Sequence, residues 1–258
     1  GLASGLFWML LLVTRRVVRV PAALLVRLAA MGVLFSAGSV ASFLSIEYIP
    51  ASLSALLFYI YPAIVAAGSA LFFRQRLSLA RLLVLLTATA GCVLTVDVQS
   101  GAGPIDATGV ALALAAPCFY SGYVLIGSRV TAHVAPLNAS AWIITFAAIV
   151  IVLAGASGVL GDRFTTDVAP RGWAAMIGLA IFSTVISISA FLAGMARLDP
   201  FRASIISTVE PVITVILAAL LLAERLTGQQ ALGGFVIVTS SAALQFISRC
   251  EGRSGRDA

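Results

Sequence analysis

The chain has 258 residues, of which 61% are hydrophobic and only 10% charged, and its mean hydropathy is +1.10. A soluble domain of this size carries about 25% charged residues, so a soluble globule is excluded. The formal net charge of +6 is carried by arginine with no lysine, and so few charges do not indicate nucleic-acid binding. The composition predicts an all-α polytopic membrane protein.

The predicted elements are nine apolar runs separated by short polar segments. Each is too long and too continuous for the alternating ten-residue strands of a membrane β-barrel, and most approach the roughly 20 residues of a membrane-spanning helix. We therefore predict nine helices, with consecutive helices antiparallel. In chain order the runs are 1–14, 25–47, 51–73, 79–98, 107–128, 137–158, 172–195, 201–222 and 229–248.

The first run is too short to cross a membrane, and its basic cluster, Arg15, Arg16 and Arg19, follows it. A signal peptide carries its positive charge before the apolar stretch. We therefore expect this run to be the second half of a helix whose start is missing.

The loop arginines predict how the chain lies in the membrane. If the Arg15–Arg19 loop is cytoplasmic and the sides alternate, 13 of the 16 arginines fall on the cytoplasmic side. This bias is the positive-inside pattern. It predicts a multi-pass protein of the plasma membrane (the inner membrane of a prokaryote), with residues 249–258 forming a cytoplasmic polar tail.

An internal repeat relates the two halves of the chain. A shift of 149 residues superposes Pro62 on Pro211, Ile64 on Ile213 and Leu83 on Leu232 without a gap. The shift carries each matched turn to the other side of the membrane, as in the inverted repeats of secondary transporters. We predict a first repeat over 1–100 and a second over 101–248.

Three segments resemble one family: Leu57–Pro62, Ser207–Ile213 and Leu220–Thr227. These segments resemble the EamA family of the drug/metabolite transporter superfamily, whose most recognisable stretch is a proline-containing helix followed by a Glu-Arg-Leu turn. The resemblance implies ten helices in two inverted five-helix repeats, both termini cytoplasmic, and export of small metabolites, amino acids or drugs.

This chain departs from the family pattern in two places. Gln75 stands where the second repeat has Glu224. The repeat also places the counterpart of run 107–128 before residue 1. We therefore expect a ten-helix protein that lacks its first helix and the start of its second.

Glu210 is the one acidic residue deep inside an apolar run. Burying a charge there costs several kcal/mol, so it should be protonated, paired or facing a watery cavity. Alternatively, it bonds to a backbone carbonyl freed by Pro211 or caps a helix break. Helical spacing places Ser207 and Thr214 on its face. Facing it, the third run would supply an aromatic wall from Ser54, Phe58 and Tyr61.

Further substrate-binding candidates share helix faces or lie near small residues. For the serines among them the alternative is close packing or hydrogen bonding between helices, which is the usual role of small hydroxyl residues in a membrane. Pro62 and Pro211 each remove a backbone donor and are either hinges or static packing features. The remaining candidates are Ser36, Ser39, Tyr120, Tyr123, Ser183 and Ser187.

The sequence lacks the phosphate-binding loop of an ATPase, a metal-binding cluster and a catalytic triad, so we expect no enzyme, cofactor or metal. The prediction is a secondary transporter that moves a small organic solute by alternating access, as an exporter. Its expected partners are that solute and the lipid bilayer, without nucleic acid; small-residue stretches suit a homodimer surface or internal packing. The alternatives are a non-transporting membrane scaffold or subunit, and a passive channel.

Overall fold

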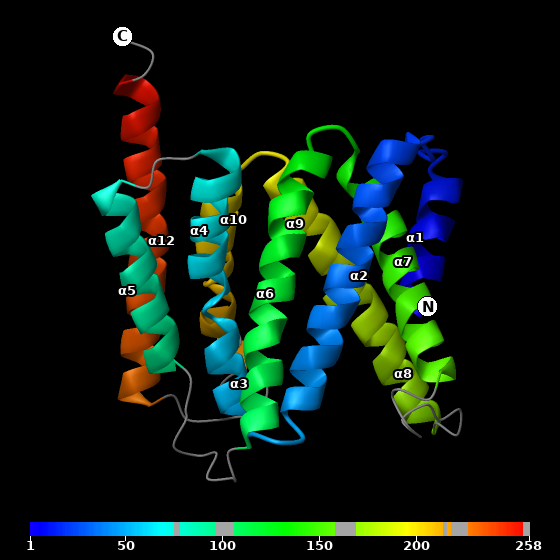
Figure 1. Cartoon of the computed structure of the whole chain (residues 1–258), viewed down its shortest axis with the longest axis horizontal. Helices are drawn as coiled ribbons and strands as arrows, with labels where there is room; N and C mark the ends of the chain where they lie inside the picture. The colour runs from blue at the N-terminus through cyan, green and yellow to red at the C-terminus, as the bar shows by residue number, and fades with distance from the viewer. Residues whose placement is uncertain (75–77, 96–105, 158–168, 214–215, 218–226, 255–258) are drawn as a thin grey trace. The chain divides into compact units, whose positions relative to one another are not determined.

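The computed structural model describes residues 1–74, 78–95, 106–157, 169–213, 216–217 and 227–254 (Figure 1). Every regular element in these ranges is helical, and each of the nine predicted apolar runs is mainly helical over its described part. Within the described residues, five helical segments are long and apolar enough to cross a membrane. The fold class predicted from the sequence, an all-α polytopic membrane protein, is confirmed.

Most apolar runs form uninterrupted helices. Their lengths follow from runs of apolar residues, because inside a bilayer a helix satisfies all its backbone groups internally. These helices are α1 (Leu2–Val13), α2 (Ala22–Ser45), α5 (Leu79–Thr95), α6 (Ala107–Val130), α7 (Pro136–Ala156) and α12 (Gly228–Ser254).

Two runs are interrupted, and a third changes helix type along its length. The run 51–73 divides into α3 (Ala51–Phe58) and α4 (Tyr61–Phe73). The eighth run begins with α10 (Pro200–Ser207) and is interrupted after it. The run 170–195 passes without a gap from α8 (Pro170–Gly178) through the π-helix η2 (Leu179–Ile186) to α9 (Ser187–Met195).

The chain forms two compact units. Unit 1 comprises residues 1–37 and 122–198, and unit 2 comprises residues 38–121 and 199–258. Each unit therefore takes one segment from each half of the sequence, and α2 and α6 each contribute residues to both. These units are not the predicted repeats, whose boundary near residue 100 stays a prediction.

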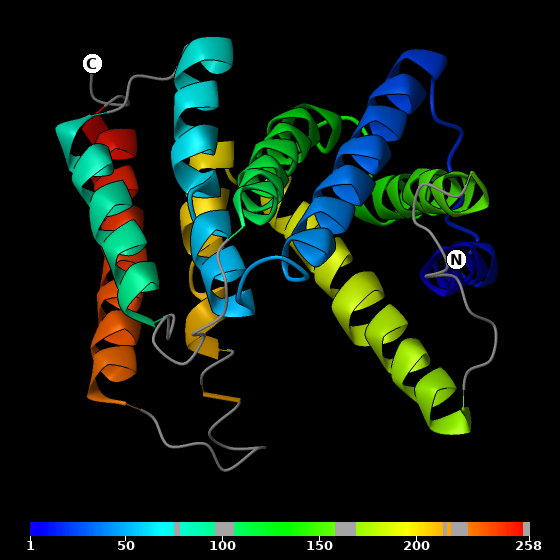
Figure 2. The same ribbon diagram turned by 60° about the horizontal axis from the view of Figure 1, so that its bottom comes forward.

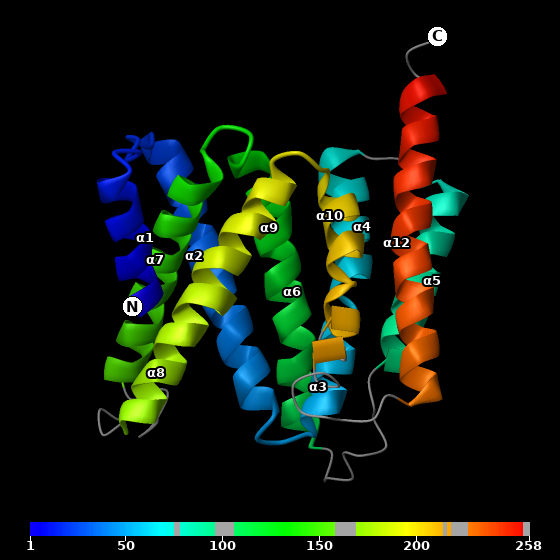
Figure 3. The ribbon, with the colours of Figure 1, turned by 180° about the vertical axis from the view of Figure 1, so that it is seen from behind.

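In unit 1, α1 packs against α7, and Figure 3 shows the two helices side by side. Thr145 on α7 accepts a hydrogen bond from the indole N–H of Trp8 at 2.9 Å, and its hydroxyl lies 2.8 Å from that of Ser4. The rings of Trp8 and Trp142 meet edge to face, with centroids 5.1 Å apart. Both tryptophans therefore serve packing between helices.

In unit 2, α5 and α12 lie along each other, as Figure 2 shows. Their backbones approach closely where Gly91 meets Gly233: a Cβ added at Gly233 would lie 2.5 Å from the Thr95 hydroxyl. A side-chain hydrogen bond from Ser240 to Thr87, 2.9 Å long, joins the same helices. Glycine here permits close contact between helices, as is common in membranes.

The core of unit 2 continues from this pair to α4 and α10, which lie beside each other in Figures 1 and 2. Its buried members are small or branched apolar side chains with one aromatic ring. They are Ala66, Val84, Leu85, Ala88, Phe201, Ile205 and Leu244.

Candidate functional site

The candidate site is built around two helix breaks in unit 2. The first lies at residues 59–60, between α3 and α4, and the second lies at residues 208–209, after α10. Pro62 and Pro211 follow their breaks by two residues. Because proline has no N–H and its ring crowds the preceding turn, neither run can continue as a regular helix through this point.

Three backbone hydrogen bonds at the first break have counterparts at the second under the 149-residue shift. Each break is bridged by a tight bond over three residues, and each following helix begins on the carbonyl of the residue two before the proline. In the first break these are Ile60 N–H to Leu57 at 3.2 Å, Ala63 N–H to Ile60 at 3.0 Å and Ile64 N–H to Ile60 at 3.3 Å. In the second they are Val209 N–H to Ile206 at 3.1 Å, Val212 N–H to Val209 at 3.0 Å and Ile213 N–H to Val209 at 3.2 Å.

The prolines predicted as hinges thus lie beside full interruptions of the helices. Whether the breaks move during function stays a prediction. Sequence reasoning placed the candidate hinges at the prolines themselves, whereas the backbone departs from the helix two to three residues earlier. A proline perturbs the turn that precedes it, which accounts for the offset.

Three aromatic rings gather at the first break. The ring centroids of Phe58 and Tyr61 are 5.4 Å apart, those of Phe58 and Tyr120 are 5.3 Å apart, and those of Tyr61 and Tyr120 are 5.0 Å apart in an edge-to-face arrangement. These separations are typical of attractive aromatic pairs. The structure therefore brings together three of the aromatic residues that the sequence identified.

Tyr61 connects three helices through hydrogen bonds. Its hydroxyl donates to the carbonyl of Ser204 on α10 at 3.0 Å, and its own carbonyl accepts from the hydroxyl of Ser121 on α6 at 3.2 Å. Ser121 also donates to the Pro117 carbonyl of its own helix at 2.6 Å. The Tyr61 side chain is only 2% exposed, so these bonds hold it in one position.

Glu210 begins the helical turn that follows the second break, and its side chain is exposed. It lies close enough to Tyr59, Tyr61 and Tyr120 to interact with each electrostatically. The hydroxyl of Ser207 donates to the Ala203 carbonyl at 3.0 Å and is also within hydrogen-bonding reach of the Tyr61 side chain. The predicted polar and aromatic walls therefore meet at the two breaks.

Tyr59 is a member of this group that the sequence analysis did not single out. It stands inside the Leu57–Pro62 segment, where its ring lies 6.5 Å from that of Phe58. The signal available was its position: under the repeat shift it is the counterpart of Thr208, at the other break.

Two other candidates of unit 2 have different surroundings. Ser54 is buried, and its hydroxyl lies 2.6 Å from that of Ser45, so it links α3 to the end of α2. Ser39 is half-buried on α2. Thr214 and the Glu224–Arg225 turn lie outside the described residues.

The remaining candidates belong to unit 1. Tyr123 is buried and stacks on Phe191, with centroids 6.2 Å apart. Ser36 is buried and donates to the Val33 carbonyl of its own helix at 3.0 Å. Ser183 and Ser187 are exposed, within η2 and at the start of α9 respectively. The predicted set is therefore divided between the two units.

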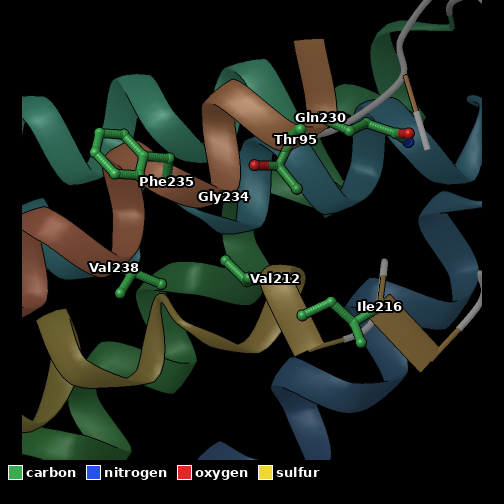
Figure 4. Close-up of a pocket in the computed structure, with 8 residues that line it drawn as sticks. Thr95, Val212, Ile216, Gln230, Gly234, Phe235 and Val238 are labelled. Atoms are coloured by element: carbon green, nitrogen blue, oxygen red, sulfur yellow. The ribbon is translucent and has the colours of Figure 1, made fainter. Parts of the chain in front are cut away.

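Unit 2 also contains an apolar pocket of about 290 Å³ beside the helical turn after Pro211 (Figure 4). The side chains of Thr95 and Gln230 lie at one end of it, as Figure 4 shows. Sequence reasoning did not predict this pocket. Its lining residues are Thr95, Val212, Ile216, Gln230, Ala231, Gly234, Phe235 and Val238.

The described residues contain no cluster of three or more histidine, cysteine or acidic side chains that could bind a metal ion. What unit 2 presents is an acidic side chain with hydroxyl and aromatic neighbours where two interrupted helices run beside each other. Interrupted helices are a recurrent feature of solute sites in secondary transporters.

Comparison with known proteins agrees with this geometry. Residues 107–245 match the EamA-like transporter family. The chain belongs to this family. It is 27% identical over 199 residues to the threonine/homoserine exporter RhtA of Salmonella typhimurium, and the match covers 77% of this chain and 64% of the exporter.

Two further similarities fit the same assignment. The chain is 26% identical over 208 residues to an uncharacterised transporter of Synechocystis, covering 79% of this chain and 61% of the relative. A crystal structure with 22% sequence identity superposes with a TM-score of 0.79 over 95% of this chain and 85% of the other, which shows a common fold. The chain thus spans slightly under two thirds of the length of these curated relatives. This EamA-like chain is a multi-pass membrane protein whose relatives are named as transporters.

Proposed function

We propose that this EamA-like chain moves a small zwitterionic solute, of the size and chemistry of threonine or homoserine, outward across the plasma membrane. The observation that carries the proposal is the cluster at the paired helix breaks, where Glu210 is close to Tyr59, Tyr61 and Tyr120. The name of the similar exporter supports the choice of solute class.

The chemistry of the cluster suits an amino acid. A carboxylate and the faces of aromatic rings both attract an ammonium group. The N-terminus of α4, which begins at Tyr61, presents the positive end of a helix dipole, which favours a carboxylate. A zwitterion would therefore find a partner for each of its charges within one cluster.

The matched breaks also support alternating access as the mechanism. Inverted repeats allow one half of a transporter to adopt the conformation of the other, which opens a central site to each side in turn. Here the two breaks share their hydrogen-bond pattern across the 149-residue shift, and their helices run in opposite directions in Figure 1.

Transport in proteoliposomes tests this proposal. We expect the chain to catalyse counterflow of labelled threonine or homoserine, and Glu210→Ala to slow it by about tenfold, the equivalent of about 1.4 kcal/mol. Tyr48→Phe is the control, because Tyr48 lies exposed in the turn after α2, and it should leave counterflow unchanged.

Two outcomes would favour the alternatives. Flux without counterflow would indicate a passive channel. Flux no faster than in empty vesicles, for amino acids, sugars and amines alike, would contradict a transporter and favour a membrane scaffold.

A further inference from the structure

The two breaks correspond in sequence and backbone pattern, yet they differ in one hydrogen bond. In the first, the Tyr59 N–H is shared between the carbonyls of Ala55, at 3.3 Å, and Leu56, at 3.2 Å. In the second, the Thr208 N–H donates to the Ile205 carbonyl at 3.1 Å, and the Thr208 hydroxyl donates to the same oxygen at 2.6 Å.

This difference leaves a carbonyl at the second break for a partner outside the helix. Ser204 is the counterpart of Ala55 under the 149-residue shift, and its carbonyl accepts the Tyr61 hydroxyl at 3.0 Å. We call a break open when its first N–H does not reach the carbonyl four residues before it, as at Thr208 and Ser204. A buried carbonyl without a donor is costly, so Tyr61 stabilises the open form of the second break. The first break is closed, because the Tyr59 N–H also bonds to the Ala55 carbonyl.

The counterpart of Tyr61 under the same shift is Glu210, and each residue directly precedes its proline. If the two breaks exchange forms, the symmetric contact runs from the Glu210 side chain to the Ala55 carbonyl. A carboxylate can only accept a hydrogen bond, whereas a protonated carboxyl can donate one. The contact therefore exists only when Glu210 carries a proton.

We propose that Tyr61 and Glu210 exchange roles between the two states of the transporter, and that proton uptake by Glu210 is required for the state opposite to the one described here. In this structure, the Tyr61 hydroxyl holds the second break open at Ser204. In the opposite state, the protonated Glu210 carboxyl donates to Ala55 and holds the first break open. This inference rests on the proposed function.

The groups around Glu210 suit this role. The titratable side chains that interact with it include Tyr59 at the break, Tyr61 on α4 and Tyr120 on α6. Cys92 on α5 in turn interacts with Tyr59 and Tyr61. All four are neutral when protonated, so none of them supplies a positive charge that would hold Glu210 ionised.

Counterflow at two pH values tests the exchange. Wild-type counterflow should fall from the lower pH to the higher one, because raising the pH removes the proton with which the Glu210 carboxyl would donate to the Ala55 carbonyl. Glu210→Gln loses the carboxylate that attracts the ammonium group, so its counterflow should be slower than that of the wild type, but it retains a donor at every pH and should show no such fall. Glu210→Leu can never donate and should be slow at both pH values. The matched control Glu47→Gln, which changes an exposed carboxylate in a turn, should keep the wild-type profile.

Hydrogen exchange gives a readout that does not depend on a solute. After correction for the intrinsic pH dependence of exchange, lowering the pH should protect the Thr208 amide and expose the Tyr59 amide in the wild type. Tyr61→Phe should have the same effect as lowering the pH: slower exchange of the Thr208 amide and faster exchange of the Tyr59 amide. At each pH the exchange rates should change by about fivefold, which corresponds to the net contribution of one hydrogen bond.

The results separate the two proposals. Wild-type counterflow with a pH profile that Glu210→Gln leaves intact would overturn the exchange while preserving the transporter. Opposite pH-dependent changes at Tyr59 and Thr208 without any counterflow would support the exchange and contradict the solute class. If the two amides respond to neither pH nor Tyr61→Phe, the exchange of roles is wrong.

Discussion

At the scale of single residues, hydroxyl and amide side chains supply the hydrogen bonds that water supplies in a soluble protein. Inside a bilayer every polar group must find a partner in the protein. Ser121 and Tyr61 each reach a carbonyl on a neighbouring helix. Asn138, which is 3% exposed at the start of α7, instead secures the segment after α1. Its Oδ1 accepts the Val18 N–H at 3.1 Å, and its Nδ2 donates to the Arg16 carbonyl at 3.0 Å.

Asn138→Ala should therefore destabilise unit 1. It removes both bonds, and we expect a loss of about 1–2 kcal/mol in the free energy of unfolding, as for two partly compensated hydrogen bonds. Thermal unfolding in detergent measures it. Ser140→Ala is the control on the same helix, because the Ser140 hydroxyl donates to the Pro136 carbonyl of its own helix. Equal losses for the two variants would contradict the role assigned to Asn138.

At the scale of elements, two devices shape unit 2: prolines that interrupt helices and glycines that let helices touch. The prolines position Tyr61 and Glu210 at helix starts. The glycines bring α12 against α5, where the Gly91 carbonyl would lie 2.8 Å from a Cβ added at Gly233. Because backbone atoms fill this space, a methyl group there can be accommodated only if the helices move apart.

Gly233→Ala should weaken the pairing of α5 with α12. Overpacking of this kind costs about 1–3 kcal/mol, measured as a lower unfolding temperature in detergent. Gly194→Ala is the matched control, since a Cβ there would meet nothing within 4 Å and alanine is the better helix former. A Gly233→Ala protein as stable as Gly194→Ala would show that α5 and α12 do not pack closely.

At the scale of the whole molecule, we propose that the distribution of arginines orients the chain. With 13 of the 16 arginines on one side of the predicted loops, the positive-inside pattern places the loop containing His133 in the cytoplasm and the turn containing Glu47 outside.

Cysteine labelling tests this orientation. In a chain whose native cysteines are replaced, Glu47→Cys should react with a membrane-impermeant maleimide in intact cells. His133→Cys should react only after the membrane is opened. Both parent residues are exposed in turns between helices, so each is accessible to the reagent. The reverse labelling pattern would invert the proposed topology.

The sequence predicted more of the fold than of the site. Helix number and position followed from apolar runs, because lipid requires long continuous apolar helices wherever the chain crosses. Glu210 was singled out as a candidate because it is the one acidic residue deep in an apolar run. Helical spacing added Ser207 on its face, and Phe58 and Tyr61 on the corresponding face of the third run. Ser54 illustrates what sequence could not supply: its spacing matched the aromatic face, but its partner is Ser45 on the preceding helix.

What the sequence by itself determined is the class of protein and the positions of its apolar helices; it also predicted the pairing of Pro62 with Pro211. These depend on composition and local backbone chemistry, which are properties of the chain read in order. Only the tertiary structure decided that Tyr61 bonds to Ser204 and that the candidate residues divide between two units. The reason is physical: the partner of a hydroxyl group depends on which helix lies beside it, and apolar periodicity does not specify the neighbour of a helix that is apolar on every face.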